Sequence, residues 1–178
     1  MNRFKYRYVA LLVGVLLFWA PDVTAYDLVS RYVTVSFSDY DDLRQFNNEL
    51  YMGRLNSKIK KSRGYTIEDE VMSKIDFIVE KVMAVLDMFP AGLKFSMVIN
   101  ANEKQVQNDF KKLYKVDVDY IAFYSPSKNT VFYSADNATL KVVAHEIGHV
   151  VAENYFTISP PQRIHEVMAQ FAEQHISD

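Results

Sequence analysis

The chain has 178 residues and a net charge of −2, with 49% hydrophobic and 24% charged residues. This composition is typical of a globular protein large enough to bury a core, and it excludes the disordered and fibrous classes. The near-neutral charge lacks the basic surface of nucleic-acid-binding proteins, so no nucleic-acid partner is expected. The absence of cysteine excludes disulfides, thiolate metal ligands and cysteine nucleophiles.

The first 25 residues have the layout of a secretory signal peptide. Basic residues occur between positions 3 and 7, an uncharged and mostly apolar run covers 9–20, and small residues suited to cleavage lie at 23–25. The apolar run is shorter than the ~20 residues of a membrane span, although an uncleaved anchor is the alternative. The sequence therefore predicts export to the periplasm or the extracellular space, with cleavage after Ala25. One domain over residues 26–178 and no stable membrane association after cleavage are expected.

The first elements of the mature chain are a strand and a helix. Polar and apolar residues alternate over 31–37, which predicts a strand. A helix then begins with Ser38 as its cap, runs to Met52 and stops at Gly53. Residues 54–65 are predicted to form a loop.

The clearest helix of the sequence begins at Thr66, which forms a capping box with Asp69. Apolar residues then recur at helical spacing as far as Phe89, and Pro90 ends the helix. This pattern predicts a long scaffold helix that packs along the core.

The remaining elements include a β-hairpin and end in helices. We expect a strand at 94–100, a helix at 102–114, strands at 120–125 and 130–134, a helix at 137–155, and a last helix from Pro161 with Ser159 as its cap. The whole order predicts an α+β fold, in which a small mixed sheet is backed by the long helix. The hairpin with its edge strand and the two final helices follow.

All four histidines lie near the C-terminus, and two belong to the motif His145-Glu146-Ile147-Gly148-His149. On a helix, residues four apart lie on one face, so both imidazoles can bind one metal ion, and imidazole is a good zinc ligand. Glu146 can then act as a general base on a metal-bound water. The surrounding helix is apolar and buried, where unpaired polar groups are costly. A core helix with hydrogen-bonded polar residues is the alternative.

A catalytic zinc needs a third protein ligand, and Glu166 is the favoured candidate. The segment between His149 and Glu166 is long enough for a turn and a second helix that folds back. The small Ala169 would let the two helices approach closely. Gln170 lies on the same helix face as Glu166 and could accept a hydrogen bond from a ligand histidine. The rival third ligands are His165 and His175.

The motif HEIGH followed by Glu166 in an E-x-x-A context resembles the gluzincin group of zinc metallopeptidases. With its short C-terminal part, the chain is similar to the reduced minigluzincin forms. The resemblance covers about residues 120–171. It implies a zincin-like fold, Zn²⁺ bound by two histidines and a glutamate, and a hairpin whose first strand receives an extended peptide. Many gluzincins have aspartate where this chain has Gln170.

These observations predict a secreted zinc-dependent endopeptidase that acts on a peptide or protein substrate. The substrate would pair with the strand at 120–125, nearest the metal at Ala122 and Phe123. The alternative for this strand is an interior position in the sheet with its aromatic residues in the core. The alternatives for the function are a catalytically weak or inactive zinc-containing extracellular binding module, and a metal-dependent hydrolase of another bond, such as a cell-wall amide.

Overall fold

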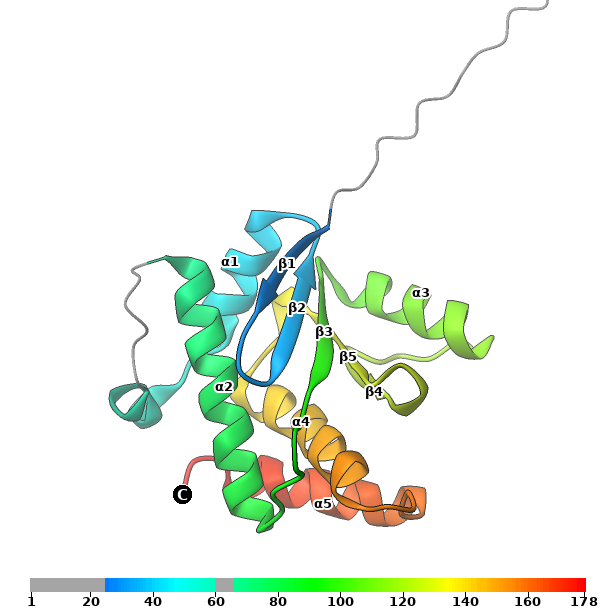
Figure 1. Ribbon diagram of the computed structural model, residues 1–178. Coiled ribbons are helices and arrows are strands. Elements are labelled where there is room, and N and C mark those ends of the chain that lie inside the picture. The colour runs from blue at the N-terminus through cyan, green and yellow to red at the C-terminus, as the bar shows by residue number, and fades with distance from the viewer. Residues whose placement is uncertain (1–24, 60–65) are drawn as a thin grey trace, which may run out of the picture.

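The computed structural model describes residues 25–59 and 66–178. The predicted signal peptide, apart from Ala25, and the end of the predicted loop at 54–65 lie outside the described residues. The described chain forms a five-stranded mixed sheet with helices on both faces (Figure 1). The predicted α+β class is therefore confirmed.

The strand order in the sheet is β1-β2-β3-β5-β4. The strands are β1 (Tyr26–Val29), β2 (Val33–Phe37), β3 (Phe95–Asn100), β4 (Ala122–Ser125) and β5 (Thr130–Ser134). The three central strands β2, β3 and β5 are parallel, whereas β1 and β4 pair antiparallel with their neighbours. β4 is thus an edge strand, as the hairpin pattern predicts, and it begins at Ala122 rather than at 120.

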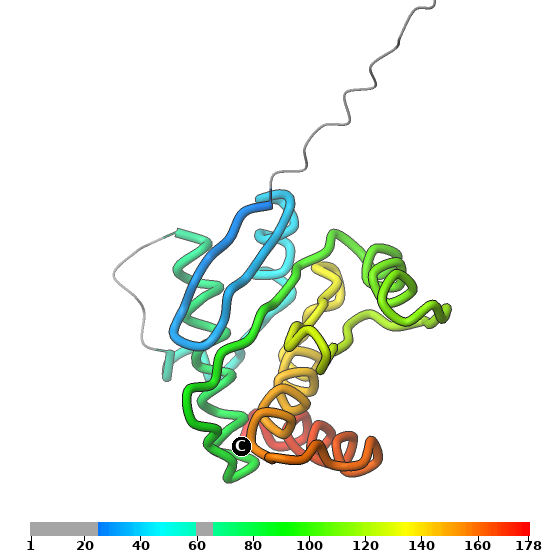
Figure 2. The backbone as a smooth tube through the Cα atoms, turned by 45° about the vertical axis from the view of Figure 1, so that its right-hand side comes forward, coloured from blue at the N-terminus to red at the C-terminus, as the bar shows by residue number. Residues whose placement is uncertain are grey.

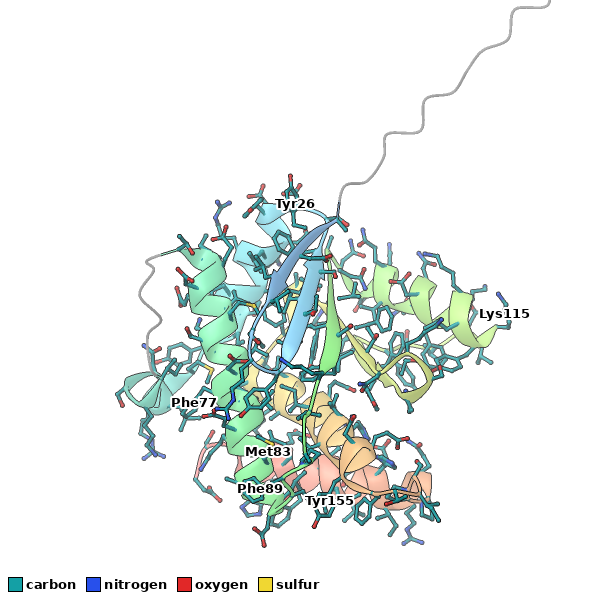
Figure 3. The ribbon with its side chains drawn as sticks, in the orientation of Figure 1. Tyr26, Phe77, Met83, Phe89, Lys115 and Tyr155 are labelled. Carbon is teal, nitrogen blue, oxygen red and sulfur yellow. The ribbon has the colours of Figure 1, made fainter. Side chains whose placement is uncertain are left out.

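The other edge strand, β1, was not expected from the sequence. Its residues are mostly exposed, so they show no alternation of buried and exposed positions. β1 is held by its pairing with β2, where Tyr26 lies opposite Phe37. The Tyr26 ring, labelled in Figure 3, also stacks on Phe37 and contacts Tyr40.

The helices divide between the two faces of the sheet. α1 (Tyr40–Glu49), α2 (Ile67–Leu86) and α4 (Leu140–Tyr155) lie on one face, and α3 (Glu103–Tyr114) lies on the other (Figure 1). α5 (Gln162–His175) packs against α4 and also contacts α2. Three 3₁₀ turns, η1 (Gly53–Lys58), η2 (Pro126–Lys128) and η3 (Ala135–Asn137), complete the described elements. Figure 2 shows α3 and α5 on either side of the β4–β5 hairpin.

The long scaffold helix predicted from Thr66 is α2. The Thr66 hydroxyl accepts a hydrogen bond from the Asp69 backbone N–H at 3.2 Å, so Thr66 caps the helix as predicted, and the same hydroxyl lies 3.1 Å from the Asp69 carboxylate. Its apolar residues join the main core between the helices and the sheet. The helix ends at Leu86, three residues before the predicted Phe89, because Asp87 adopts the left-handed conformation, with φ of 52°.

Two predicted helix caps are wrong. Asp39, rather than Ser38, caps α1 by accepting from the Asp41 backbone N–H, and the helix ends at Glu49 rather than Met52. α5 begins after Pro161 without a side-chain cap. The Ser159 hydroxyl instead donates to Glu153 at 2.7 Å, so it ties the loop to the end of α4.

In the described part of the chain, no helix combines the length and apolar character needed to cross a bilayer.

Candidate metal centre

The predicted histidine pair lies on α4, which begins where the Thr139 hydroxyl accepts the backbone N–H of Val142. Most of the following helix is buried against the sheet and α5. His145 and His149 lie one turn apart with ring centroids separated by 5.0 Å. Both imidazoles therefore face the same point beside α5.

α5 brings Glu166 to this histidine pair. One carboxylate oxygen lies 3.7 Å from Nε2 of His145, and the other lies 3.7 Å from Nε2 of His149. The three side chains together offer ligand atoms within 4.8 Å of one another, a group that could hold a metal ion. The donor set fits zinc, because tetrahedral ligands at ~2.0–2.2 Å from one ion lie roughly 3.3 Å apart.

The two helices can approach this closely because both carry small residues at their crossing. A Cβ placed on Gly148 would lie 2.9 Å from the Ala169 Cα and 3.3 Å from the Ala172 Cβ. Ala169 thus has the role expected from the sequence. The glycine inside the HEIGH motif is what sets the distance between the histidines and Glu166.

Glu146 lies in the same cleft but is not part of the metal-binding group. Burial, followed by the negative charge of Glu166, raises the pKa of its carboxyl to about 8, although a hydrogen bond from the Tyr124 backbone N–H acts in the opposite direction. In the absence of a cation, this carboxyl therefore holds its proton at neutral pH. The position beside β4 suits a group that exchanges a proton in the cleft.

His149 is held in its neutral form. Burial, followed by the neighbouring His145, lowers the pKa of His149 to about 4, whereas Glu166 acts in the opposite direction. Only the neutral imidazole has a lone pair to donate to a metal. At neutral pH His149 could therefore donate its lone pair to a cation.

Two residues that the sequence did not assign to the site contact the candidate ligands. Oε2 of Glu173 lies 3.2 Å from Nδ1 of His145, which leaves Nε2 of that ring free to face Glu166. The Gln162 amide donates to Oε1 of Glu166 at 2.8 Å. Gln170, which was expected to support a histidine, is exposed, and no hydrogen bond found among the described residues joins it to a histidine. The contact with His145 is instead made by Glu173, which lies seven residues after Glu166 and so two turns further along the same helix.

The rival ligands have other partners. Nε2 of His165 lies 3.0 Å from Glu153 and 3.4 Å from the Ser159 hydroxyl. This ring lies beside His149, with centroids 5.8 Å apart, but its Nε2 is directed to the end of α4. His175 pairs with Asp178 at 2.6 Å near the C-terminus.

The metal-binding group opens into a cleft of about 710 Å³. The β4 residues Ala122, Phe123 and Tyr124 form one wall, and residues of α4 and α5 form the other. The Ser134 N–H donates to the carbonyl of Ile121, so the backbone of Ile121 faces β5. Along an antiparallel strand, every second residue forms such hydrogen bonds with the neighbouring strand. Phe123 and Ser125 therefore also direct their backbone N–H and C=O groups towards β5. Ala122 and Tyr124 consequently present theirs to the free edge.

Comparison of the chain with models of protein families, with curated proteins and with solved structures finds no match.

Proposed function

We propose that this protein is a zinc-dependent peptidase that cleaves internal bonds of extended peptides. The observation that carries this proposal is Glu146, a buried carboxyl beside a group of two histidines and a glutamate that could hold a metal ion. A purely structural metal site would not require such a group. Two imidazoles and a glutamate carboxylate form the donor set of many catalytic zinc sites.

When bound, zinc would lower the pKa of a coordinated water to ~7 and polarise the carbonyl of the substrate. Glu146 would act as the general base: it takes the proton from the attacking water and later delivers it to the amine as the C–N bond breaks. The Tyr124 N–H holds the carboxylate in place beside the edge strand. Glu173 would keep the ligand His145 oriented, and Gln162 would do the same for the ligand Glu166.

The free edge of β4 supports a peptide as substrate. The outward N–H and C=O of Ala122 can pair with an extended chain, and such main-chain bonds do not depend on side-chain identity. The side chain of Phe123 lines the same cleft. Among the described residues, no lysine or arginine lines it, so the cleft offers no basic side chain of that kind to pair with a C-terminal carboxylate. This arrangement favours internal peptide bonds.

The test is digestion of an unfolded protein, with and without a chelator and after zinc is added back. The Glu146→Gln variant should retain one equivalent of zinc and lose ~10²–10⁴-fold in turnover, because an amide cannot take the proton. The His149→Ala variant should lose both zinc and turnover. Near-normal turnover of Glu146→Gln would remove this residue from the mechanism. If the zinc-loaded parent binds peptides but cleaves none of them, the binding-module alternative replaces the peptidase.

We also propose that the protein is exported and processed after Ala25. β1 begins at Tyr26, so cleavage there would leave the sheet whole. The mass of the protein purified from its native host should correspond to a chain that begins at or near Tyr26. A membrane-bound chain with intact Met1 would instead support the anchor.

A further inference from the structure

An aromatic cluster covers the side of the cleft that faces α3. We define this aromatic wall as Phe110 and Tyr114 of α3, Tyr120 before β4, and Phe123 of β4; all four line the cleft. Phe110 is the centre, with ring centroids 4.7 Å from Tyr114, 5.2 Å from Tyr120 and 5.0 Å from Phe123. Figure 3 shows side chains filling the space between α3 and the hairpin, with Lys115 marking the end of the helix.

Part of this aromatic wall is left open to solvent. Tyr120 is 47% exposed and Tyr114 is 38% exposed, whereas Phe123 is 5% exposed. The Phe123 ring also stacks on the ring of Phe132 in β5, with the two ring centroids 4.6 Å apart. The inner rings are thus fixed and the outer rings still have apolar surface to bury.

We propose that the aromatic wall is a specificity site that takes one large apolar or aromatic side chain of the substrate. The proposal rests on the proposed peptidase function. It gives α3 a role in selecting substrates, although this helix contributes none of the candidate metal ligands.

The geometry of strand pairing directs a substrate side chain onto this surface. Residues directly opposite each other in paired strands project to the same face. Phe123 projects towards α3, as its contact with Phe110 shows, and the hydroxyl of Ser125 meets that of Tyr114 at 2.7 Å on the same face. A peptide residue opposite Phe123 would therefore project onto the aromatic wall, while its neighbours would project towards α4.

The aromatic wall is also close to the candidate catalytic residue. Tyr124 directly follows Phe123, and its backbone N–H reaches the Glu146 carboxyl. An extended chain advances ~3.3 Å per residue. The substrate residue at the aromatic wall should therefore lie within about two residues of the cleaved bond.

The distribution of charged residues in the cleft also favours an apolar or aromatic substrate side chain at the aromatic wall. Glu153, Ser159 and His165 occupy another part of the lining, where Glu153 is engaged with both of the others. The aromatic wall itself carries no charged side chain. An acidic substrate residue would therefore lose hydration there without gaining a partner.

The experiment measures peptide binding to the zinc-loaded Glu146→Gln protein by fluorescence polarisation. The probes are labelled seven-residue peptides of alanine and glycine, with Phe, Ala or Glu at the central position. The Phe peptide should bind at least about tenfold more tightly than the Ala peptide, which corresponds to ~1.4 kcal/mol, and the Glu peptide should bind no better than the Ala peptide. Adding Tyr120→Ala, or separately Tyr114→Ala, should reduce the Phe-to-Ala ratio to below about threefold. Tyr51→Ala, which removes a tyrosine that is 79% exposed outside the cleft, should leave the ratio unchanged.

Equal binding of the Phe and Ala peptides would overturn the specificity site, as would a ratio that neither cleft variant changes. Turnover of the parent protein separates the two proposals. Cleavage without an aromatic preference contradicts only the specificity site. Selective binding without cleavage contradicts only the peptidase. Where the parent does cleave the Phe peptide, mass spectrometry should place the cut within two residues of Phe.

Discussion

Glu146 lies buried on α4 next to the edge strand, and this environment makes the metal-free fold sensitive to pH. The folded carboxyl has a pKa of about 8, raised from 4.5 mainly by burial and then by Glu166. The unfolded chain loses this proton near pH 4.5, whereas the folded chain keeps it to about pH 8. Folding stability therefore falls as the pH rises through this window, by up to ~1.4 kcal/mol per pH unit for one proton.

Replacing Glu146 with glutamine should remove this loss. With metal chelated, Glu146→Gln should become progressively more stable than the parent between pH 4.5 and 8, and the difference should then level off. The buried His149, whose low pKa acts in the opposite direction below pH 6.5, is present in both proteins and largely cancels. Urea unfolding at pH 5, 6.5 and 8 measures the difference. The exposed Glu49→Gln should give the same pH profile as the parent, and a constant difference for Glu146→Gln would contradict the assigned burial effect.

Glu173 on α5 contacts the candidate ligand His145 on α4. Its carboxylate is 3.2 Å from Nδ1 of His145, and such a partner fixes the ring and its tautomer. Glu173→Gln should weaken zinc binding by ~10–100-fold without unfolding the protein, because the side chain is 34% exposed. Competition with a coloured chelator measures this affinity. Gln170→Ala is the matched control on the same helix and should bind zinc like the parent. If Gln170→Ala weakened zinc binding and Glu173→Gln did not, Gln170 rather than Glu173 would be the residue that orients the histidine.

At the scale of elements, the crossing of α4 and α5 determines whether three ligands can meet. Gly148→Ala would place a Cβ 2.9 Å from the Cα of Ala169. The helices must then separate, at a cost of ~1–3 kcal/mol, and Glu166 would move away from the histidines. We expect a lower thermal midpoint and weaker zinc binding in this variant. Lys141→Ala, an exposed change on the same helix, should leave both unchanged, and normal zinc affinity in Gly148→Ala would show that the ligands do not depend on this close approach.

The sequence predicts those elements and residues whose placement depends on local geometry. Histidines four apart on an apolar helix must share a face, and the hairpin before α4 must stay near it. Glu173 could not be identified in the same way, because its contact with His145 depends on how α5 crosses α4. The strand β1 also went undetected, since its exposed residues leave no periodic pattern. At helix ends, neighbouring cap candidates such as Ser38 and Asp39 compete, and only the folded backbone selects between them.

At the scale of the whole molecule, the candidate metal would connect two helices that are otherwise joined by packing and a short loop. His145 and His149 belong to α4 and Glu166 belongs to α5. α5 in turn packs against α2, and Lys81 of α2 donates to the carbonyl of Asp178. A metal that bound only these assembled residues would therefore stabilise the folded C-terminal helices together with the scaffold helix.

This linkage predicts a metal-dependent thermal midpoint. Free zinc at 100 times its dissociation constant should stabilise the fold by ~2.7 kcal/mol, which raises the midpoint by roughly 5–10 °C for a chain of this size. Calorimetry with chelator and with buffered zinc measures the shift. His149→Ala and Glu166→Ala should abolish most of it, because each removes a ligand. His175→Ala should retain it, since His175 pairs with Asp178 away from the cleft. An identical midpoint with and without zinc, or a shift that survives loss of His149, would exclude these three residues as the metal site.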